Sequence, residues 1–167
     1  MDLYLLRHGM AANRDPVRFP DDRLRPLTTR GEQRIRDISK AMRRLDLGID
    51  LIWCSPFLRT RQTAAATAEE LDLGNRLQPQ EQLSPDGEPG KLLAELASLE
   101  AGPDNVLLVG HEPYLSTLLS ILVSGGPSVQ IDFKKGGLAR LKTTGPLGLD
   151  QCAVLQWFLP PRLLLRI

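Results

Sequence analysis

Short apolar runs alternate along the chain with segments of helical periodicity, and no other feature limits the fold so strongly. Residues 3–6, 51–54 and 105–109 are short, nearly continuous apolar runs, the pattern of strands covered on both faces of a sheet. Apolar side chains at helical spacing occupy much of the chain between them. Strands that alternate with helices pack as parallel neighbours. The sequence therefore predicts an α/β fold, a three-layer α/β/α sandwich around a mostly parallel central sheet.

The starts of the helices also have recognisable patterns. Thr29 and the glutamate three residues later match a capping box, so the first helix is expected to take Thr29 as its N-cap and to end near Gly48. Ser55 and Pro56 have the pattern of an N-cap followed by a first-turn proline, which starts the second helix. Two further helices are predicted over residues 91–99 and 113–123.

Two polar segments are expected to be irregular. Residues 12–30 contain three prolines and five arginines, which three aspartates partly balance. This stretch is predicted to be either a solvated loop or a partner-binding surface. Residues 74–90 are rich in Pro, Gln and Gly and are predicted to be mostly connection, with room for one short strand. Three more strands are predicted near residues 129–133, 138–142 and 153–158.

Length and charge narrow the classes of function. A chain of 167 residues suits one domain over residues 1–167, and a net charge of +1 offers no broad field for nucleic acid or an anionic membrane. The longest apolar-rich stretch, residues 114–123, is far shorter than the roughly 20 residues that cross a bilayer, and no secretory signal pattern opens the chain. Cys54 and Cys152 lack Cys-x-x-Cys spacing, so free thiols in a reducing, cytoplasmic compartment are expected.

The chain has only two histidines, and each follows the exit of an apolar run. His8 comes after residues 3–6, and His111 after residues 105–109. The exit of the remaining run leads to Arg59, in the first turn of the predicted second helix. Ligands of parallel sheets bind beyond the carboxyl ends of the strands, so Arg7, His8, Arg59 and His111 are expected to converge there. Two guanidinium groups near helix N-termini suit the oxygens of a phosphoryl group.

A bound phosphoryl group still needs a nucleophile if the protein is an enzyme. The sequence has no recognisable nucleophile elbow, Cys-His arrangement or Gly-x-x-x-x-Gly-Lys loop, which leaves histidine. A neutral imidazole can attack phosphorus near pH 7, and adjacent arginines keep it unprotonated. Such a reaction proceeds through a phosphohistidine that water hydrolyses. A metal site using both histidines is disfavoured, because too few residues have metal-binding spacing.

Three ordered motifs resemble those of one known family. Residues 6–9 (Leu-Arg-His-Gly), 55–64 (Ser-Pro-Phe-Leu-Arg-Thr-Arg-Gln-Thr-Ala) and 110–112 (Gly-His-Glu) resemble the motifs of the histidine phosphatase superfamily, which includes the phosphoglycerate mutases. The resemblance implies a phosphoglycerate mutase-like fold in which His8 is the nucleophile and Arg7 and Arg59 bind phosphate. It also implies that His111 completes the pocket as a hydrogen-bond donor.

Within this superfamily the chain is similar to the small SixA-type phosphohistidine phosphatases. Residues 7–11 place an alanine where mutase-like members carry a polar or acidic residue, and residues 25–31 resemble an Arg-Pro-Leu-Thr-x-x-Gly run of the SixA group. The short chain also leaves no room for the insertions that cover the active site in mutases. The resemblance implies a cofactor-free phosphatase that acts on phosphohistidine of a signalling protein.

Two other functions remain open at this point. The first is a small-molecule phosphomonoesterase, for which Glu81 would serve as the general acid; Glu81 is equally well explained as a solvated loop residue. The second is a phosphoprotein-binding module with little turnover, for which the arginine-rich residues 12–30 would form the contact surface. A phosphohistidine needs a weaker acid than a monoester, because imidazole is a far better leaving group than an alkoxide.

Overall fold

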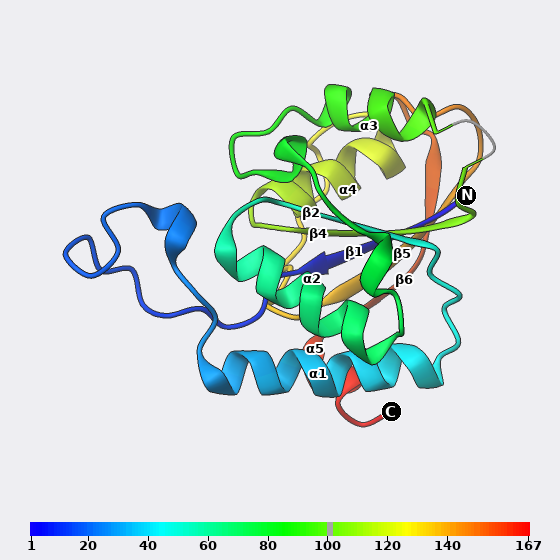
Figure 1. Cartoon of the computed structure of the whole chain (residues 1–167). Helices are drawn as coiled ribbons and strands as arrows, with labels where there is room; N and C mark the ends of the chain where they lie inside the picture. Colours follow the sequence, from blue (N-terminus) through cyan, green and yellow to red (C-terminus); the bar gives the residue numbers. More distant parts are fainter. Residues whose placement is uncertain (100–101) are drawn as a thin grey trace.

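The computed structural model describes residues 1–99 and 102–167, and it contains one six-stranded sheet (Figure 1). The strands are β1 (Asp2–Arg7), β2 (Leu51–Cys54), β3 (Leu77–Pro79), β4 (Asn105–Gly110), β5 (Leu138–Thr143) and β6 (Ala153–Leu159). They lie in the order β3-β2-β4-β1-β5-β6; the first four are parallel to one another, and β5 is antiparallel to both of its neighbours, β1 and β6. The mostly parallel sheet is therefore confirmed, together with the short strand allowed for between residues 74 and 90.

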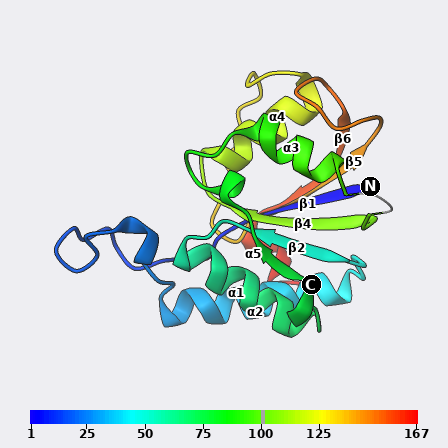
Figure 2. The same ribbon diagram turned by 45° about the horizontal axis from the view of Figure 1, so that its top comes forward.

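Helices cover both faces of this sheet. They are α1 (Thr29–Arg44), α2 (Leu58–Glu70), α3 (Pro89–Ala97), α4 (Tyr114–Ser124) and α5 (Pro161–Leu164), with short 3-10 turns η1 (Asp22–Leu24), η2 (Gly74–Arg76) and η3 (Glu81–Leu83). α3 and α4 lie on one face, and α1, α2 and α5 lie on the other (Figure 1 and Figure 2). This arrangement confirms the predicted three-layer α/β/α sandwich.

The central strands are buried on both faces. Along β1, Leu3 and Leu5 belong to the apolar cluster formed with α3 and α4, whereas Tyr4 and Leu6 belong to the cluster formed with α1 and α2. None of these four side chains is more than 1% exposed. Burial of each leucine contributes about 1.5–3 kcal/mol to stability. The sheet is thus a rigid platform, and the residues just beyond its carboxyl edge have fixed positions.

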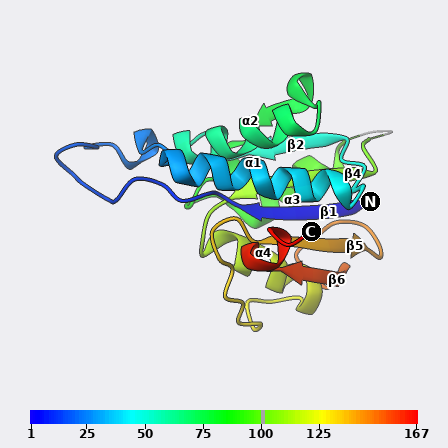
Figure 3. The ribbon, with the colours of Figure 1, turned by 90° about the horizontal axis from the view of Figure 1, so that it is seen from below.

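Residues 12–28, which we call the arm, form a long irregular excursion between β1 and α1 (Figure 3). The base of the arm is closed by a hydrogen bond from the Ala12 N–H to the Pro26 carbonyl (2.9 Å) and by an isolated bridge between Ala11 and Leu27. The irregular structure predicted for residues 12–30 is confirmed up to residue 28, whereas Thr29 and Arg30 already belong to α1. Because the arm leaves the sheet directly after β1, its base lies beside the carboxyl edge.

The boundaries of α1 differ from the prediction. Thr28 is the N-cap, and its side chain accepts a hydrogen bond from the Gly31 N–H (3.0 Å), so the choice of Thr29 was wrong by one residue. Thr28 can cap because its backbone is extended (φ −76, ψ 157), whereas Thr29 is already helical. The helix ends at Arg44, ahead of the expected Gly48, whose positive φ of 59 belongs to the turn before β2.

Ser55 does not cap α2, contrary to the sequence prediction. The helix begins at Leu58, and Phe57 occupies the N-cap position without a capping side chain. The Ser55 hydroxyl is fully buried, accepts a hydrogen bond from the Phe57 N–H (3.3 Å) and contacts His111. The serine therefore belongs to the carboxyl edge of the sheet rather than to the helix.

Residues 129–133 do not form the predicted strand. β5 already pairs with β1 at that edge, so no free edge of β1 is left for them. Side chains satisfy their backbone instead: the Val129 N–H donates to Ser120 Oγ (2.9 Å), and the Phe133 carbonyl accepts from Arg7 Nη1 (2.6 Å). The apolar alternation in this segment reflects the burial of side chains such as Phe133 and not a sheet.

The cysteines are buried and unbridged, which confirms the expected free thiols. Burial raises the pKa of the Cys54 thiol to about 11, so this thiol is a poor nucleophile. Among the helices in the described part of the chain, none is long and apolar enough to cross a membrane.

Candidate active site

The two histidines lie side by side at the carboxyl edge of the sheet. His8 follows the last residue of β1, and His111 follows the last residue of β4, the parallel neighbour of β1. The backbone N–H of His8 donates to the Gly110 carbonyl (3.1 Å), which continues the pairing of the two strands by one residue. The ring centroids are 5.2 Å apart, and the two residues are only 5% and 2% exposed. The predicted convergence of the two imidazoles is therefore present.

The hydrogen bond of the His8 ring fixes its tautomer. Its Nδ1 lies 2.8 Å from the Gly9 carbonyl oxygen, which can only accept, so Nδ1 carries the proton. The lone pair of a neutral ring is then on Nε2. Burial, with help from the charges of Arg59, Arg7 and Lys135, lowers the pKa of His8 to about 3. At neutral pH the ring is uncharged and presents a nucleophilic nitrogen.

His111 is held by a serine that the sequence analysis had assigned to a helix cap. His111 Nε2 lies 2.8 Å from Ser55 Oγ, and the Phe57 ring packs edge-on against the imidazole with centroids 5.0 Å apart. Burial, and next the electrostatic interaction between the two imidazoles, lower the pKa of His111 to about 3. If the Ser55 hydroxyl donates to Nε2, the proton of the neutral ring is on Nδ1. Ser55 follows β2 directly, and this position at the end of a parallel strand could have identified it as a site residue from the sequence.

Arg59 lies in the first turn of α2, as predicted, and is only 4% exposed. Both of its terminal nitrogens contact Asp22 of the arm: Nη1 donates to the Asp22 carbonyl (2.8 Å), and Nη2 is 3.0 Å from Asp22 Oδ2. The guanidinium also lies over the Phe57 ring, 4.9 Å from its centroid. The other carboxylate oxygen of Asp22, Oδ1, accepts a hydrogen bond from Arg25 Nε (2.9 Å). Asp22 was not predicted as a site residue, because only the path of the arm brings it to α2.

Asp22 is the ionised carboxylate of the site. Partial burial alone would raise its pKa, but the hydrogen bond and charge of Arg25 and the charge of Arg59 outweigh burial, so the pKa of this carboxyl falls below its usual value. Burial lowers the pKa of Arg59 as well, yet arginine stays protonated in proteins. The arm therefore brings a fixed negative charge to one side of the Arg59 guanidinium and leaves its Nε side free.

Buried nitrogen atoms without a partner gather at this site. In residues 1–99 and 102–167, seven buried side-chain polar atoms lack a hydrogen bond, and the three that are nitrogens are Arg7 Nε, Arg59 Nε and His111 Nδ1. Buried polar groups normally have partners, so such a set calls for an explanation. Two of the three are guanidinium donors, and His111 Nδ1 is a third in the tautomer above. An anion with several oxygens would satisfy all of them at once.

Glu81, the general acid considered in the sequence analysis, is exposed on η3. The carboxylates whose charges act on Arg7 are instead Glu112 and Asp132. Glu112 accepts two hydrogen bonds from Ser116, from its N–H (3.1 Å) and its hydroxyl (2.8 Å). Burial raises the pKa of Glu112. These bonds tie Glu112 to the start of α4.

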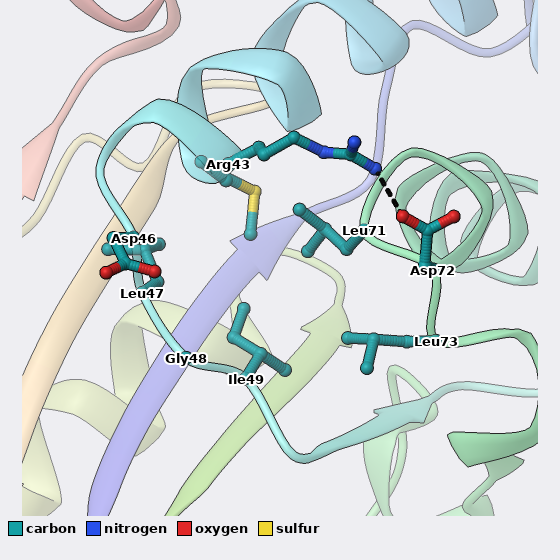
Figure 4. Close-up of a pocket in the computed structure, with 9 residues that line it drawn as sticks. Arg43, Asp46, Leu47, Gly48, Ile49, Leu71, Asp72 and Leu73 are labelled. Atoms are coloured by element: carbon teal, nitrogen blue, oxygen red, sulfur yellow. Dashed lines mark hydrogen bonds and ion pairs between the residues drawn. The ribbon is translucent and has the colours of Figure 1, made fainter.

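A separate cavity of about 330 Å³ lies between α1 and α2 near Gly48, at the opposite end of β2 (Figure 4). Arg43 and Asp72 form an ion pair at its side (2.9 Å), and Met42 and Leu71 contribute apolar atoms. None of the four predicted site residues lines it. This cavity is therefore separate from the candidate active site.

Fold and site together define a phosphoglycerate mutase-like α/β protein with two imidazoles and two arginines at the carboxyl edge of its sheet. The chain belongs to the histidine phosphatase superfamily (branch 1), whose family model matches residues 3–84. This membership supports phosphatase activity.

Known relatives agree with this placement. The chain is 31% identical to phosphohistidine phosphatase SixA of Escherichia coli strain K12 over 126 residues, 75% of this chain and 76% of the relative. It is 38% identical over 144 residues to an uncharacterised protein of a Picosynechococcus strain, 86% of each chain. A solved structure of the protein histidine phosphatase SixA complexed with tungstate superposes with a TM-score of 0.82, at 27% identity, over 98% of this chain and 99% of that one.

Proposed function

We propose that this protein is a phosphohistidine phosphatase that removes the phosphoryl group from a phosphohistidine on a signalling protein, with His8 as the nucleophile. One observation carries the proposal: a neutral His8 with a free Nε2 lies beside three buried nitrogens that have no partner among the described residues. A tetrahedral dianion fits this arrangement, because its oxygens accept hydrogen bonds while its phosphorus faces the imidazole. Phosphate binding by Arg7 and Arg59 and support by His111 belong to the same proposal.

The reaction has two steps. In the first, the Nε2 lone pair of His8 attacks phosphorus, and the P–N bond to the substrate imidazole breaks, with its electron pair going to the leaving nitrogen. The substrate ring carries a proton from solvent on its other nitrogen, so it leaves as neutral imidazole. In the second step water attacks the phosphorus of phosphorylated His8, the new P–N bond breaks, and inorganic phosphate leaves. The arginines stabilise the charge on the transferring group in both steps.

The acids near the site favour a P–N bond over a phosphate ester. Asp22 is held ionised by Arg25 and Arg59 and cannot donate a proton at neutral pH. Burial raises the pKa of Glu112, but both of its oxygens accept hydrogen bonds from Ser116, which favour the ionised form. An alkoxide leaving group needs a strong proton donor, whereas imidazole leaves without one. The name of the Escherichia coli relative, a phosphohistidine phosphatase, supports the same substrate class.

The test compares kcat/KM for a phosphohistidine-bearing protein with values for a panel of sugar and nucleotide monophosphates. We expect the phosphohistidine substrate to be favoured by at least about a hundredfold, or roughly 2.7 kcal/mol. A monophosphate hydrolysed as fast would refute the substrate assignment, and Glu81→Gln would then show whether Glu81 supplies the acid. Tight binding of the phosphoprotein without release of phosphate would instead identify a binding module. His8→Ala is the inactive control for every substrate.

A further inference from the structure

A tight turn at residues 134–137 is fastened to the residue that precedes His8. The Gly137 N–H donates to the Lys134 carbonyl (2.7 Å), and the third residue of the turn, Gly136, has a φ of +77, as a type II turn requires. The Gly136 N–H donates to the Arg7 carbonyl (3.0 Å), and the Arg7 N–H donates to the Gly137 carbonyl (3.2 Å). Lys135, at the second position of the turn, is therefore anchored at the edge of the candidate active site.

The two lysines of this turn have different surroundings. Lys134 forms an ion pair with Asp132 (2.7 Å), so its charge is balanced. Lys135 has no ion-pair partner in the described part of the chain. Partial burial, with the charges of Arg7, Arg25 and Arg59, lowers the pKa of Lys135, and Lys135 in turn helps to lower the pKa of His8. The Lys135 ammonium therefore interacts electrostatically with the site residues, and no carboxylate of the described residues forms an ion pair with it.

The charges of the site leave Lys135 without a role in the proposed reaction. Arg7 and Arg59 present the unpartnered buried nitrogens that match a phosphoryl dianion, and Arg25 is already paired with Asp22. Lys135 differs from Arg59 in being exposed, so it lies on the solvent side of the candidate site, whereas Arg59 is buried. An exposed ammonium among three guanidinium groups is a place for a second anion.

We propose that Lys135 binds a second anionic group of the substrate, namely an acidic side chain next to the phosphorylated histidine. The inference rests on the proposed function, and it adds a preference for phosphohistidine in an acidic sequence. The flexible stem of lysine suits a contact that varies between partner proteins, and no carboxylate among residues 1–99 and 102–167 forms an ion pair with Lys135. Lys135 would then act on substrate affinity, whereas His8 acts on the phosphorus.

The experiment uses two short peptides, each with a single phosphohistidine. They differ only in the two residues on each side of it, which are glutamates in one peptide and glutamines in the other. Phosphate release by the full chain gives kcat/KM for each. We expect the wild type to prefer the acidic peptide by about fivefold, which corresponds to about 1 kcal/mol and to one partly exposed ion pair. Lys135→Met should bring this ratio close to one, and Lys135→Arg should keep most of it.

Lys134→Met is the matched control, because it removes the same charge from the same turn and should leave the ratio unchanged. If Lys135→Met lowers kcat/KM equally for both peptides, the inference is overturned, because the lysine would then interact only with the scissile phosphate. A wild type without any preference, or a ratio lost equally in Lys134→Met, would also overturn it while leaving the proposed function intact. Failure of the wild type to hydrolyse either peptide would refute the proposed function and this inference with it.

Discussion

Replacing Arg59 with alanine should change the site in two ways. The substitution removes a guanidinium whose Nε is unpartnered and buried, and it removes the ion partner of Asp22. The first change takes away charge stabilisation from the transferring phosphoryl group. The second leaves the Asp22 carboxylate bound to Arg25 alone, beside the position that phosphate would occupy.

The size of the effect follows from these contacts. Loss of one buried, preorganised donor to a developing oxyanion costs about 2.7–4 kcal/mol, a factor of about 10²–10³ in kcat. The Asp22 carboxylate, then paired with Arg25 alone, is partly exposed, so its repulsion of phosphate adds about 1 kcal/mol. Asp22→Asn should therefore restore about fivefold of the activity lost in Arg59→Ala. In the wild type the same Asp22→Asn change should lower activity, because it removes one of the contacts that orient Arg59.

The assay is a double-mutant cycle in kcat/KM on a phosphohistidine substrate. Asp22→Asn should lower kcat/KM when Arg59 is present and raise kcat/KM in the Arg59→Ala background. A loss below about tenfold in Arg59→Ala, or 1.4 kcal/mol, would refute phosphate binding by this side chain. An Asp22→Asn effect of the same sign in both backgrounds would refute the role given to the arm.

Three further predictions concern the support of the site. Ser55→Ala should lower kcat about tenfold or more with little change in KM, because it frees the His111 tautomer, and Ser55→Thr should retain more activity; equal rates would rule out positioning by the hydroxyl. Gly31→Ala should destabilise the fold by about 1–3 kcal/mol in urea denaturation, because the added Cβ would lie 2.0 Å from the Met10 carbonyl oxygen; an unchanged midpoint would contradict this close approach. The free energy of unfolding should fall as pH drops from 6.5 towards about 3, because the unfolded chain binds a proton on each histidine in this range and the native state does not. His111→Gln should reduce the slope of the unfolding free energy against pH, near pH 5, by about 1.4 kcal/mol per pH unit. An unchanged slope would mean that His111 titrates normally in the native state.

Features that depend on neighbours along the chain were predictable from the sequence. The apolar runs end with β2 and one residue before the ends of β1 and β4, and residues just past those ends meet because parallel strands share a carboxyl edge. His8 and His111 follow adjacent strands, so the contact of their rings required only the correct strand order. Arg59 needed one further step, the start of α2, and this was placed within two residues.

Features that depend on the path of an irregular segment were not predictable. Asp22 reaches Arg59 across 37 positions of sequence, and no periodicity marks where the arm turns back. Lys135 lies near Arg7 only because of the turn that follows residues 129–133, a segment wrongly predicted as a strand. Ser55 satisfied a capping pattern, yet its hydroxyl was needed by a buried imidazole, which is a tertiary contact that overrides a local preference.

The central claim is that phosphate passes through His8, and direct trapping of the phosphorylated enzyme tests it. During turnover of a phosphohistidine substrate, an alkaline quench followed by peptide mass spectrometry should find an acid-labile, base-stable phosphate on His8 in the wild type. The same phosphate should be absent from His8→Ala, which should also fail to release inorganic phosphate. Turnover that continues in His8→Ala, or a phosphate trapped on another residue, would contradict the account.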